Sequence, residues 1–178
     1  MMVYSTRRVW ETLRHKAPKV PWYSLVWGKN CPPRCSLIVW LIVKKAIVTR
    51  DRLLRWGKIN DASCQLCNSS IESREHLFVH CPYWKSLAEE LKCAMLLRPD
   101  WTQMLRMMAQ VGTSRTRMWH GLMWCLMVTY TWKERCGVIH GAQRRTPAQV
   151  ADQIRDDIQF IAYGNKSYID ILVELGYI

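Results

Sequence analysis

Apolar residues recur every three or four positions along most of this chain, which is the spacing of one face of an α-helix. Ser or Thr before such a run, and Gly or Pro after it, mark where a helix begins and ends. The predicted helices cover about residues 5–17, 21–27, 35–47, 50–56, 82–95, 101–110, 114–136, 147–161 and 168–175. No stretch shows the alternation of a half-buried strand, so we predict an all-α fold of mostly short helices.

Several predicted helices have clear end signals. Asp100 precedes an apolar run and can cap it, as Ser114 can for the long helix that follows. Thr146, Pro147 and Gln149 form a capping-box start. We expect Gly137 to stop the long helix. The only β-structure we expect is a small hairpin or turn near residues 64–67.

Length and composition indicate a folded protein with a real core. The chain has 178 residues, of which 49% are hydrophobic, with ten Trp and nine Met. Two apolar runs, 37–43 and 118–132, are shorter than the ~20 residues that span a bilayer, so we expect buried core helices and no membrane partner. The start of the chain is amphipathic and lacks the apolar core of a signal peptide. The eight cysteines then suit a reducing intracellular compartment, the nucleus or an organelle such as the mitochondrion.

The charge is unevenly distributed. The net charge is +12, and residues 1–60 carry 13 Lys or Arg against 2 acidic residues, whereas residues 61–178 carry 13 against 12. Such asymmetry favours a polyanionic partner, most often nucleic acid and less often an anionic membrane surface. A basic domain without such a partner is the alternative.

Three cysteines and a histidine follow in the pattern C-x2-C-x8-H-x4-C. Cys64 and Cys67 can point inward from one tight turn, and His76 and Cys81 can complete a tetrahedral shell for Zn²⁺. His80 competes with His76, but it adjoins Cys81, and neighbouring side chains usually point apart. The segment therefore predicts a small zinc knuckle of the CCHC type; buried thiols without metal are the alternative.

A zinc ion held by three thiolates and one imidazole has no open position for water and is a poor Lewis acid. We therefore expect a structural site and no enzymatic activity. Cys136 and His140 stand four residues apart, but no third group orients them as a nucleophilic pair.

The segments YSTRRVWETL, WYSLVWGKNCPPR, IVWLIVKKAIVTRDRLLRWG, CQLC and ESREHLFVHC follow one another in an order that resembles a known family. It is the zinc-binding domain that follows the reverse transcriptase of plant non-LTR (long interspersed) retrotransposons. The resemblance covers about residues 4–92, and Trp132–Arg135 is similar to a later W-K-E-R-N-type motif, with Cys136 in place of the usual Asn. It implies zinc on the four residues above and binding of RNA or DNA.

The polymerase itself is missing from this sequence, which has no Y-x-D-D motif and no acidic cluster for two metal ions. We therefore expect a detached or host-recruited copy of the domain. We divide the chain into the zinc-binding domain at residues 3–98 and a helical C-terminal extension at residues 99–178.

The densest basic cluster precedes the zinc segment and is the predicted nucleic-acid contact: Lys44, Lys45, Arg50, Arg52, Arg55 and Lys58. Arg52 and Arg55 are three residues apart and can share a helix face. Such a cluster neutralises phosphates without reading sequence. A solvated helix face is the alternative for each residue. The predicted function is thus non-catalytic binding of nucleic acid, RNA more than DNA; the alternative is a recruited structural subunit of a larger RNA–protein assembly, such as an organellar ribosome, that acts mainly through protein contacts.

Overall fold

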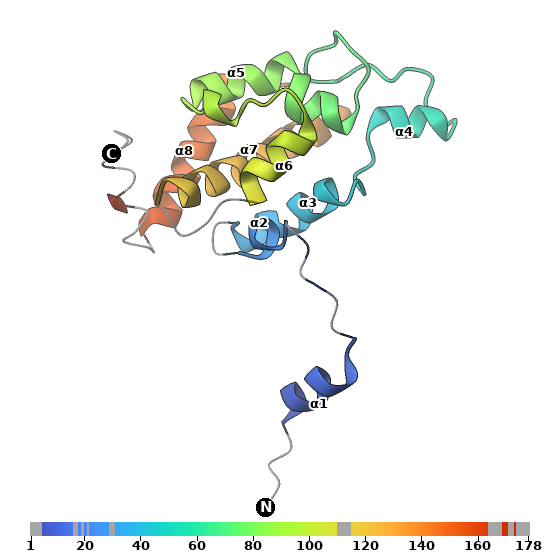
Figure 1. Cartoon of the computed structure of the whole chain (residues 1–178). Coiled ribbons are helices and arrows are strands. Elements are labelled where there is room, and N and C mark those ends of the chain that lie inside the picture. The colour runs from blue at the N-terminus through green and yellow to red at the C-terminus, as the bar shows by residue number, and fades with distance from the viewer. Residues whose placement is uncertain are drawn as a thin grey trace, which may run out of the picture.

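The computed structural model describes residues 5–15, 18, 20, 22–28, 31–109, 115–163, 169–170 and 173 (Figure 1). Its helices are α1 (Thr6–Leu13), α2 (Tyr23–Trp27), α3 (Pro33–Val43), α4 (Arg50–Arg55), η1 (His76–His80), α5 (Pro82–Glu90), η2 (Ala94–Leu96), α6 (Trp101–Ala109), α7 (Arg115–Ile139) and α8 (Pro147–Tyr163). These residues form no strand; a single antiparallel bridge joins Ser63 and Ile71. The prediction of a mostly helical fold is confirmed.

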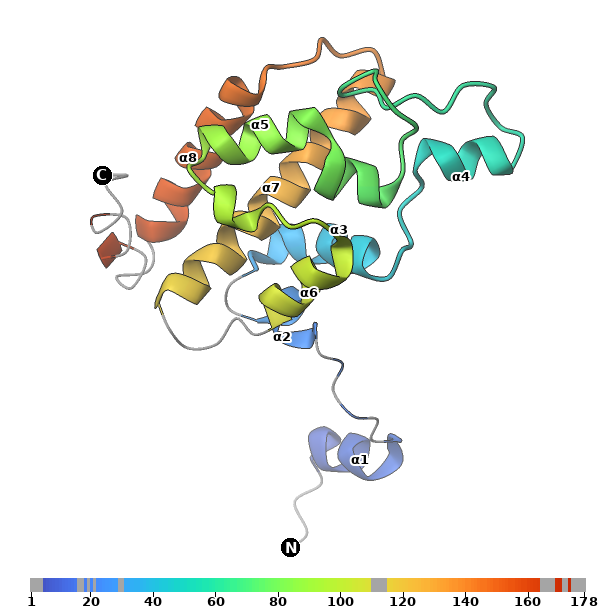
Figure 2. The ribbon, with the colours of Figure 1, turned by 45° about the horizontal axis from the view of Figure 1, so that its top comes forward.

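Helix α7 lies at the centre of the molecule. All its residues from 121 to 131 are buried, and it packs against α3, α5 and α8 (Figures 1 and 2). A helix that is covered on all sides carries apolar residues all round, which is why this run has no polar face. No helix of the described residues is long and apolar enough to cross a membrane.

Local capping chemistry sets several helix ends as predicted. The Asp100 carboxylate accepts the Gln103 N–H at 2.8 Å. The side chains of Thr146 and Gln149 each accept the other residue's backbone N–H, at 3.2 and 2.9 Å. Pro82 is the first residue of α5. The predicted cap Ser114 lies outside the described residues, as does most of the predicted helix 168–175.

Several predicted helix ends are wrong, among them those of α7 and α3. Helix α7 passes Gly137 and ends at Ile139, because Gly141, at φ 88°, makes the left-handed turn that lets the Ala142 N–H reach the Gly137 carbonyl at 2.9 Å. Helix α3 was expected to reach Ile47 but ends at Val43. There Lys45 takes the left-handed conformation, at φ 56°. This earlier end turns the chain toward α4.

Both predicted units contribute to one hydrophobic core. An aromatic row crosses the expected boundary at residue 98: the Phe78 ring lies 6.3 Å from that of Trp101, which lies 6.1 Å from that of Trp124. Helix α5 also packs along α8 (Figures 1 and 2). The C-terminal helices therefore complete the core on which the cysteine segment rests.

Helix α1 stands apart from this core in both views (Figures 1 and 2). It has the predicted apolar face, but Val9, Trp10 and Leu13 are 47%, 63% and 76% exposed. Trp27, which the helical spacing assigns to packing, is half exposed as well. The pattern predicted the helix correctly, but its apolar side is largely exposed.

Candidate metal centre

Cys64 and Cys67, the first two residues of the cluster, lie on a tight turn between Ser63 and Ile71. The Cys64 N–H bonds to the Ser70 carbonyl, and the Asn68 N–H bonds to the Cys64 carbonyl, both at 2.8 Å. Asn68 takes the left-handed conformation, at φ 55°, which Asn tolerates better than most residues. The backbone N–H groups of Leu66 and Cys67 point at the Cys64 sulfur. The turn thus brings both sulfurs to the same side.

The other two residues are aligned by a π-helical turn, η1. In an α-helix, residues five apart point about 140° away from each other, because each residue turns by about 100°. Here the Cys81 N–H bonds to the carbonyl of His76, five residues earlier, at 2.7 Å. This wider turn lets both side chains face the same point, and π turns of this kind occur often at functional sites.

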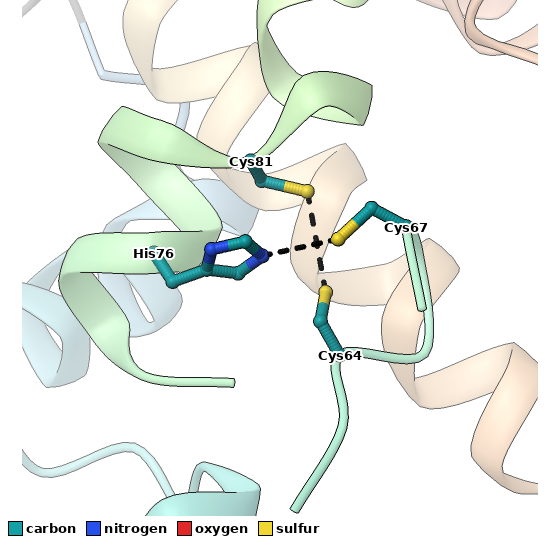
Figure 3. Close-up of side chains that lie close together, drawn as sticks. All are labelled: Cys64, Cys67, His76 and Cys81. Carbon is teal, nitrogen blue, oxygen red and sulfur yellow. Dashed lines mark hydrogen bonds between the residues drawn. The ribbon is translucent and has the colours of Figure 1, made fainter. Parts of the chain in front are cut away.

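The four side chains converge (Figure 3). Their nearest ligand atoms all lie within 4.8 Å of one another. The Cys64 and Cys81 sulfurs are 4.0 Å apart, and the Cys67 sulfur lies 3.2 Å from His76 Nε2. Around a tetrahedral zinc, bonds of about 2.3 Å to sulfur and 2.05 Å to nitrogen separate two sulfurs by about 3.8 Å and a sulfur and a nitrogen by about 3.5 Å. The donor set therefore fits zinc in type, number and spacing.

The structure also distinguishes the two histidines. His76 is buried in the cluster, and its backbone N–H donates to the Ser73 hydroxyl at 3.0 Å. His80, at the other end of η1, is exposed and does not join the cluster. Between them Leu77, Phe78 and Val79 are buried, so the core fixes the rotation of this turn.

The thiols of Cys64 and Cys81 form a hydrogen bond with each other. The hydrogen bond from Cys81 lowers the pKa of Cys64 to about 5, against the effect of burial, and the Leu66 and Cys67 N–H groups lower it further. The same hydrogen bond, with burial, raises the pKa of Cys81. Both shifts favour ionisation of one thiol of the pair, and the thiolate is the form of cysteine that binds a metal ion.

Buried ion pairing ties the cysteine segment to α7. Glu72, between the second and third cluster residues, is fully buried and accepts bonds from Arg135 Nη2 at 2.6 Å and Arg135 Nε at 3.1 Å. It also accepts the Arg50 backbone N–H at 2.9 Å. Glu134, which precedes Arg135 in the chain, is likewise buried and binds Arg145 at 2.8 Å. Glu134 and Arg135 of the 132–135 motif thus join distant segments.

The predicted basic contacts divide into two groups. Lys44, Lys45, Arg55 and Lys58 are exposed. Arg50, in contrast, is turned inward: its side chain is 16% exposed and bonds to the Asp61 carboxylate at 3.2 Å and carbonyl at 2.8 Å. The structure therefore does not favour Arg50 as a phosphate contact. Asp61 is distant enough in sequence that helix periodicity could not predict this pair.

A polar cleft of about 310 Å³ lies between α4 and the start of η1. Four cations line it, Lys45, Arg52, Arg55 and Arg74, with the acidic residues Asp51 and Glu75. Arg52 and Arg55 thus share a face, as predicted. Arg52, however, also donates to the carbonyls of Lys45 and Ile47, at 2.7 and 2.9 Å, so part of its guanidinium holds the α3–α4 connection.

Sequence reasoning missed two arginines near these sites. Arg74 lines the polar cleft, with its guanidinium 4.3 Å from the Trp101 ring centre. Arg144 donates to the Leu66 carbonyl at 2.7 Å, inside the C-x2-C turn. The position of Arg74 two residues before His76 was a usable signal. Nothing local indicates Arg144, which is 78 residues from its partner.

These features define an all-α protein with a closed Cys-Cys-His-Cys cluster on a basic surface. Residues 4–87, just under half of the chain, match a protein family described as zinc-binding in reverse transcriptase. The expected zinc-binding domain of reverse transcriptases is confirmed to this extent. No curated protein matches the chain, and no solved structure matches it either.

Proposed function

We propose that this protein is a non-catalytic, zinc-stabilised module that binds nucleic acid, RNA in preference to DNA, and that it derives from a plant non-LTR retrotransposon. The observation that carries the proposal is the Cys64, Cys67, His76 and Cys81 cluster next to an exposed basic surface. The match of residues 4–87 to a zinc-binding domain of reverse transcriptases supports it. An intracellular site, nuclear or organellar, accompanies this function.

The zinc site is structural in this proposal. Four protein donors with three sulfurs fill a tetrahedral shell, so no position remains for a substrate or an activated water. When bound, zinc supplies folding free energy to the turn-rich segment 59–75. That segment needs it, because between Ile59 and Glu75 only Ala62, Cys64, Leu66, Glu72 and Arg74 are buried.

Nucleic-acid binding is proposed through the exposed cations on one side of the zinc segment. Lys44, Lys45, Arg55 and Lys58 lie within 15 residues of chain, and two of them line the polar cleft. Lysine and arginine contacts of this kind release counterions from phosphates, which makes affinity strongly salt-dependent and largely independent of sequence. The net charge of +12 acts in the same direction.

A second candidate function is that of a structural subunit in a larger RNA–protein assembly. Helix α1 favours it, because the side of the helix that carries Val9, Trp10 and Leu13 is exposed. Apolar faces of this kind mark protein contacts when they stay uncovered in a free chain. In this case the basic surface contacts RNA and α1 docks on a protein neighbour.

The test is fluorescence anisotropy of the zinc-loaded full chain with labelled single-stranded RNA, structured RNA and duplex DNA at two salt concentrations. We expect RNA binding that weakens steeply with salt. The triple variant Lys45→Ala, Arg55→Ala, Lys58→Ala removes three phosphate contacts, so the slope of log K against log salt should fall by about 2 on single strands.

A matched variant removes the same charge elsewhere: Lys85→Ala, Arg106→Ala and Lys133→Ala, all at exposed positions. It should keep the slope of the unaltered protein. If both triple variants lose affinity equally, the effect on binding comes from net charge and not from the basic surface. Absence of binding to every probe at low salt would refute the proposed function and favour the subunit role.

A further inference from the structure

A second, less polar groove lies on the other side of the C-x2-C turn, and neither the charge pattern nor the family match assigns it a role. Its volume is about 400 Å³, within the ~300–1,000 Å³ typical of small-ligand pockets. Three segments distant in sequence build it: the turn, the first helical turn of α5 and the α7–α8 connection. Its lining residues are Leu66, Cys67, Ser69, Pro82, Tyr83, Ser86, Arg144, Arg145, Thr146 and Pro147.

Side-chain rings make up part of the groove walls: those of Pro82, Tyr83 and Pro147. Pro82 and Pro147 are the first residues of α5 and α8, which lie side by side (Figure 2). Tyr83 is 6% exposed, and its hydroxyl donates to the Arg145 carbonyl at 3.1 Å, which joins α5 to the α7–α8 connection. Leu66 adds an apolar side chain from the turn. Such ring-lined walls suit a planar, partly apolar group.

One charged side chain on the rim is available to a ligand. Arg145 is committed, because it pairs with the buried Glu134 and also bonds to Gln153. Arg144 is exposed and contacts no carboxylate among the described residues; its single bond goes from Nη1 to the Leu66 carbonyl at 2.7 Å. Its other N–H groups remain for an anion. The guanidinium is therefore held in place at the groove without being neutralised.

The rim also offers a hydroxyl. Ser86 is half-buried on the helix side of the groove, and in the described part of the chain its hydroxyl makes no hydrogen bond. Ser69, on the turn, instead donates to the Cys67 sulfur at 3.2 Å. The groove thus combines apolar walls, one unneutralised guanidinium and one available hydroxyl.

We propose that this groove binds one unpaired nucleotide of single-stranded RNA. The base enters between the rings of Pro82 and Pro147, its phosphate bonds to Arg144, and the Ser86 hydroxyl is within the groove to pair with the ribose 2′-OH. Charge complementarity favours this occupant over an apolar peptide, because the unneutralised guanidinium at the rim can form a charge-assisted hydrogen bond with a phosphate. A base within a duplex is stacked and paired, so it cannot enter.

This inference rests on the proposed function, and it adds a preference for unpaired RNA that the basic surface at α4 does not supply. Phosphate contacts alone bind single strands and duplexes without distinguishing bases. A groove that takes a base adds a contribution that depends on the base being free.

The experiment measures binding of the zinc-loaded full chain to a short single-stranded RNA, the same sequence as an RNA duplex and the same sequence as single-stranded DNA. Ser86→Met narrows the groove without changing charge. We expect about tenfold weaker binding to the single strand, an unchanged salt slope and unchanged duplex binding. Arg144→Ala should also weaken single-strand binding, but with a salt slope reduced by about 0.7, the value for one phosphate.

Arg155→Ala is the matched control. Arg155 also donates to a backbone carbonyl, that of Glu90 at 2.6 Å, but it pairs with Asp152 and does not line the groove. It should bind like the unaltered protein. Zinc content and melting temperature, measured for all three variants, show that each is folded.

The outcomes separate the two proposals. If the unaltered protein binds none of the three probes, the proposed function is refuted. If binding is salt-dependent but Ser86→Met and Arg144→Ala behave like Arg155→Ala, the proposal that the groove binds a nucleotide is refuted, while the proposed function stands. The groove would then bind a protein segment or no ligand. Equal effects of Ser86→Met on RNA and DNA single strands would overturn the RNA-specific form of the proposal.

Discussion

Replacing Arg135 with methionine tests how α7 holds the cysteine segment. The Arg135 side chain is 7% exposed and its partner Glu72 is 0% exposed, with a shortest contact of 2.6 Å. Methionine keeps much of the length and apolar volume of the side chain but removes the charge and all three hydrogen bonds to the carboxylate. Within the described part of the chain, the Glu72 carboxylate then keeps only the bond from the backbone N–H of Arg50.

Breaking a buried ion pair from one side costs about 3–5 kcal/mol, because the remaining charge is buried without compensation. A domain of this size is stable by only about 5–15 kcal/mol, so Arg135→Met should remove a large share of the stability. Because Glu72 lies between Cys67 and His76, we also expect faster zinc release to a chelator. Urea unfolding followed by circular dichroism measures the first effect, and a colorimetric zinc indicator measures the second.

The double variant Glu72→Gln, Arg135→Met separates lost packing from the buried charge. It should recover much of the stability, because no unpaired charge is left where Glu72 and Arg135 had paired. Lys133→Met, at an exposed position on the same helix, should change the stability by no more than about 0.5 kcal/mol. A loss below about 1 kcal/mol for Arg135→Met, or no recovery in the double variant, would refute the reasoning.

Three further predictions concern the metal site and a helix start. His76→Ala should lower bound zinc well below one ion per chain while His80→Ala keeps one, as native mass spectrometry can measure; the reverse result would assign the wrong histidine. Removing zinc with a strong chelator should expose the turn after Cys64 to proteolysis before α7 is cut, and equal resistance with and without zinc would show that the segment folds unaided. Thr146→Ala should cost about 1 kcal/mol in urea unfolding, since the Gln149 N–H loses its acceptor; Gln143→Ala, in the exposed connection before it, is the control.

The helices with strong local signals could be predicted because their causes lie within a few residues. Thr146 and Gln149 bond to each other three residues apart, and Asp100 caps α6 in the same way. The four cluster residues were likewise recognisable, because ligand spacing along a chain is itself the geometric requirement of a small metal site. The choice of His76 over His80 followed from a local argument, and a π turn realises it.

The exceptions involve contacts that no local pattern contains. Arg50 fits a solvated helix face in sequence, yet its partner Asp61 lies across a turn and draws it inward. Gly137 is a reasonable stop signal, but α7 continues to Ile139, and the left-handed turn that follows the helix is made by Gly141. The apolar face of α1 indicates a helix but not what covers it, because periodicity reports amphipathicity and not the partner.

The sequence by itself determined the helical class, most helix starts and the set of four metal donors, since each depends on interactions between residues close in the chain. Tertiary structure decided which charged side chains are exposed and which are engaged in contacts within the protein. It paired Glu72 with Arg135 across 63 residues, and it joined the C-x2-C turn to Arg144 across 78. Such pairs form only when the whole core has closed, because the buried charge of one segment is compensated by another segment that the core brings within reach.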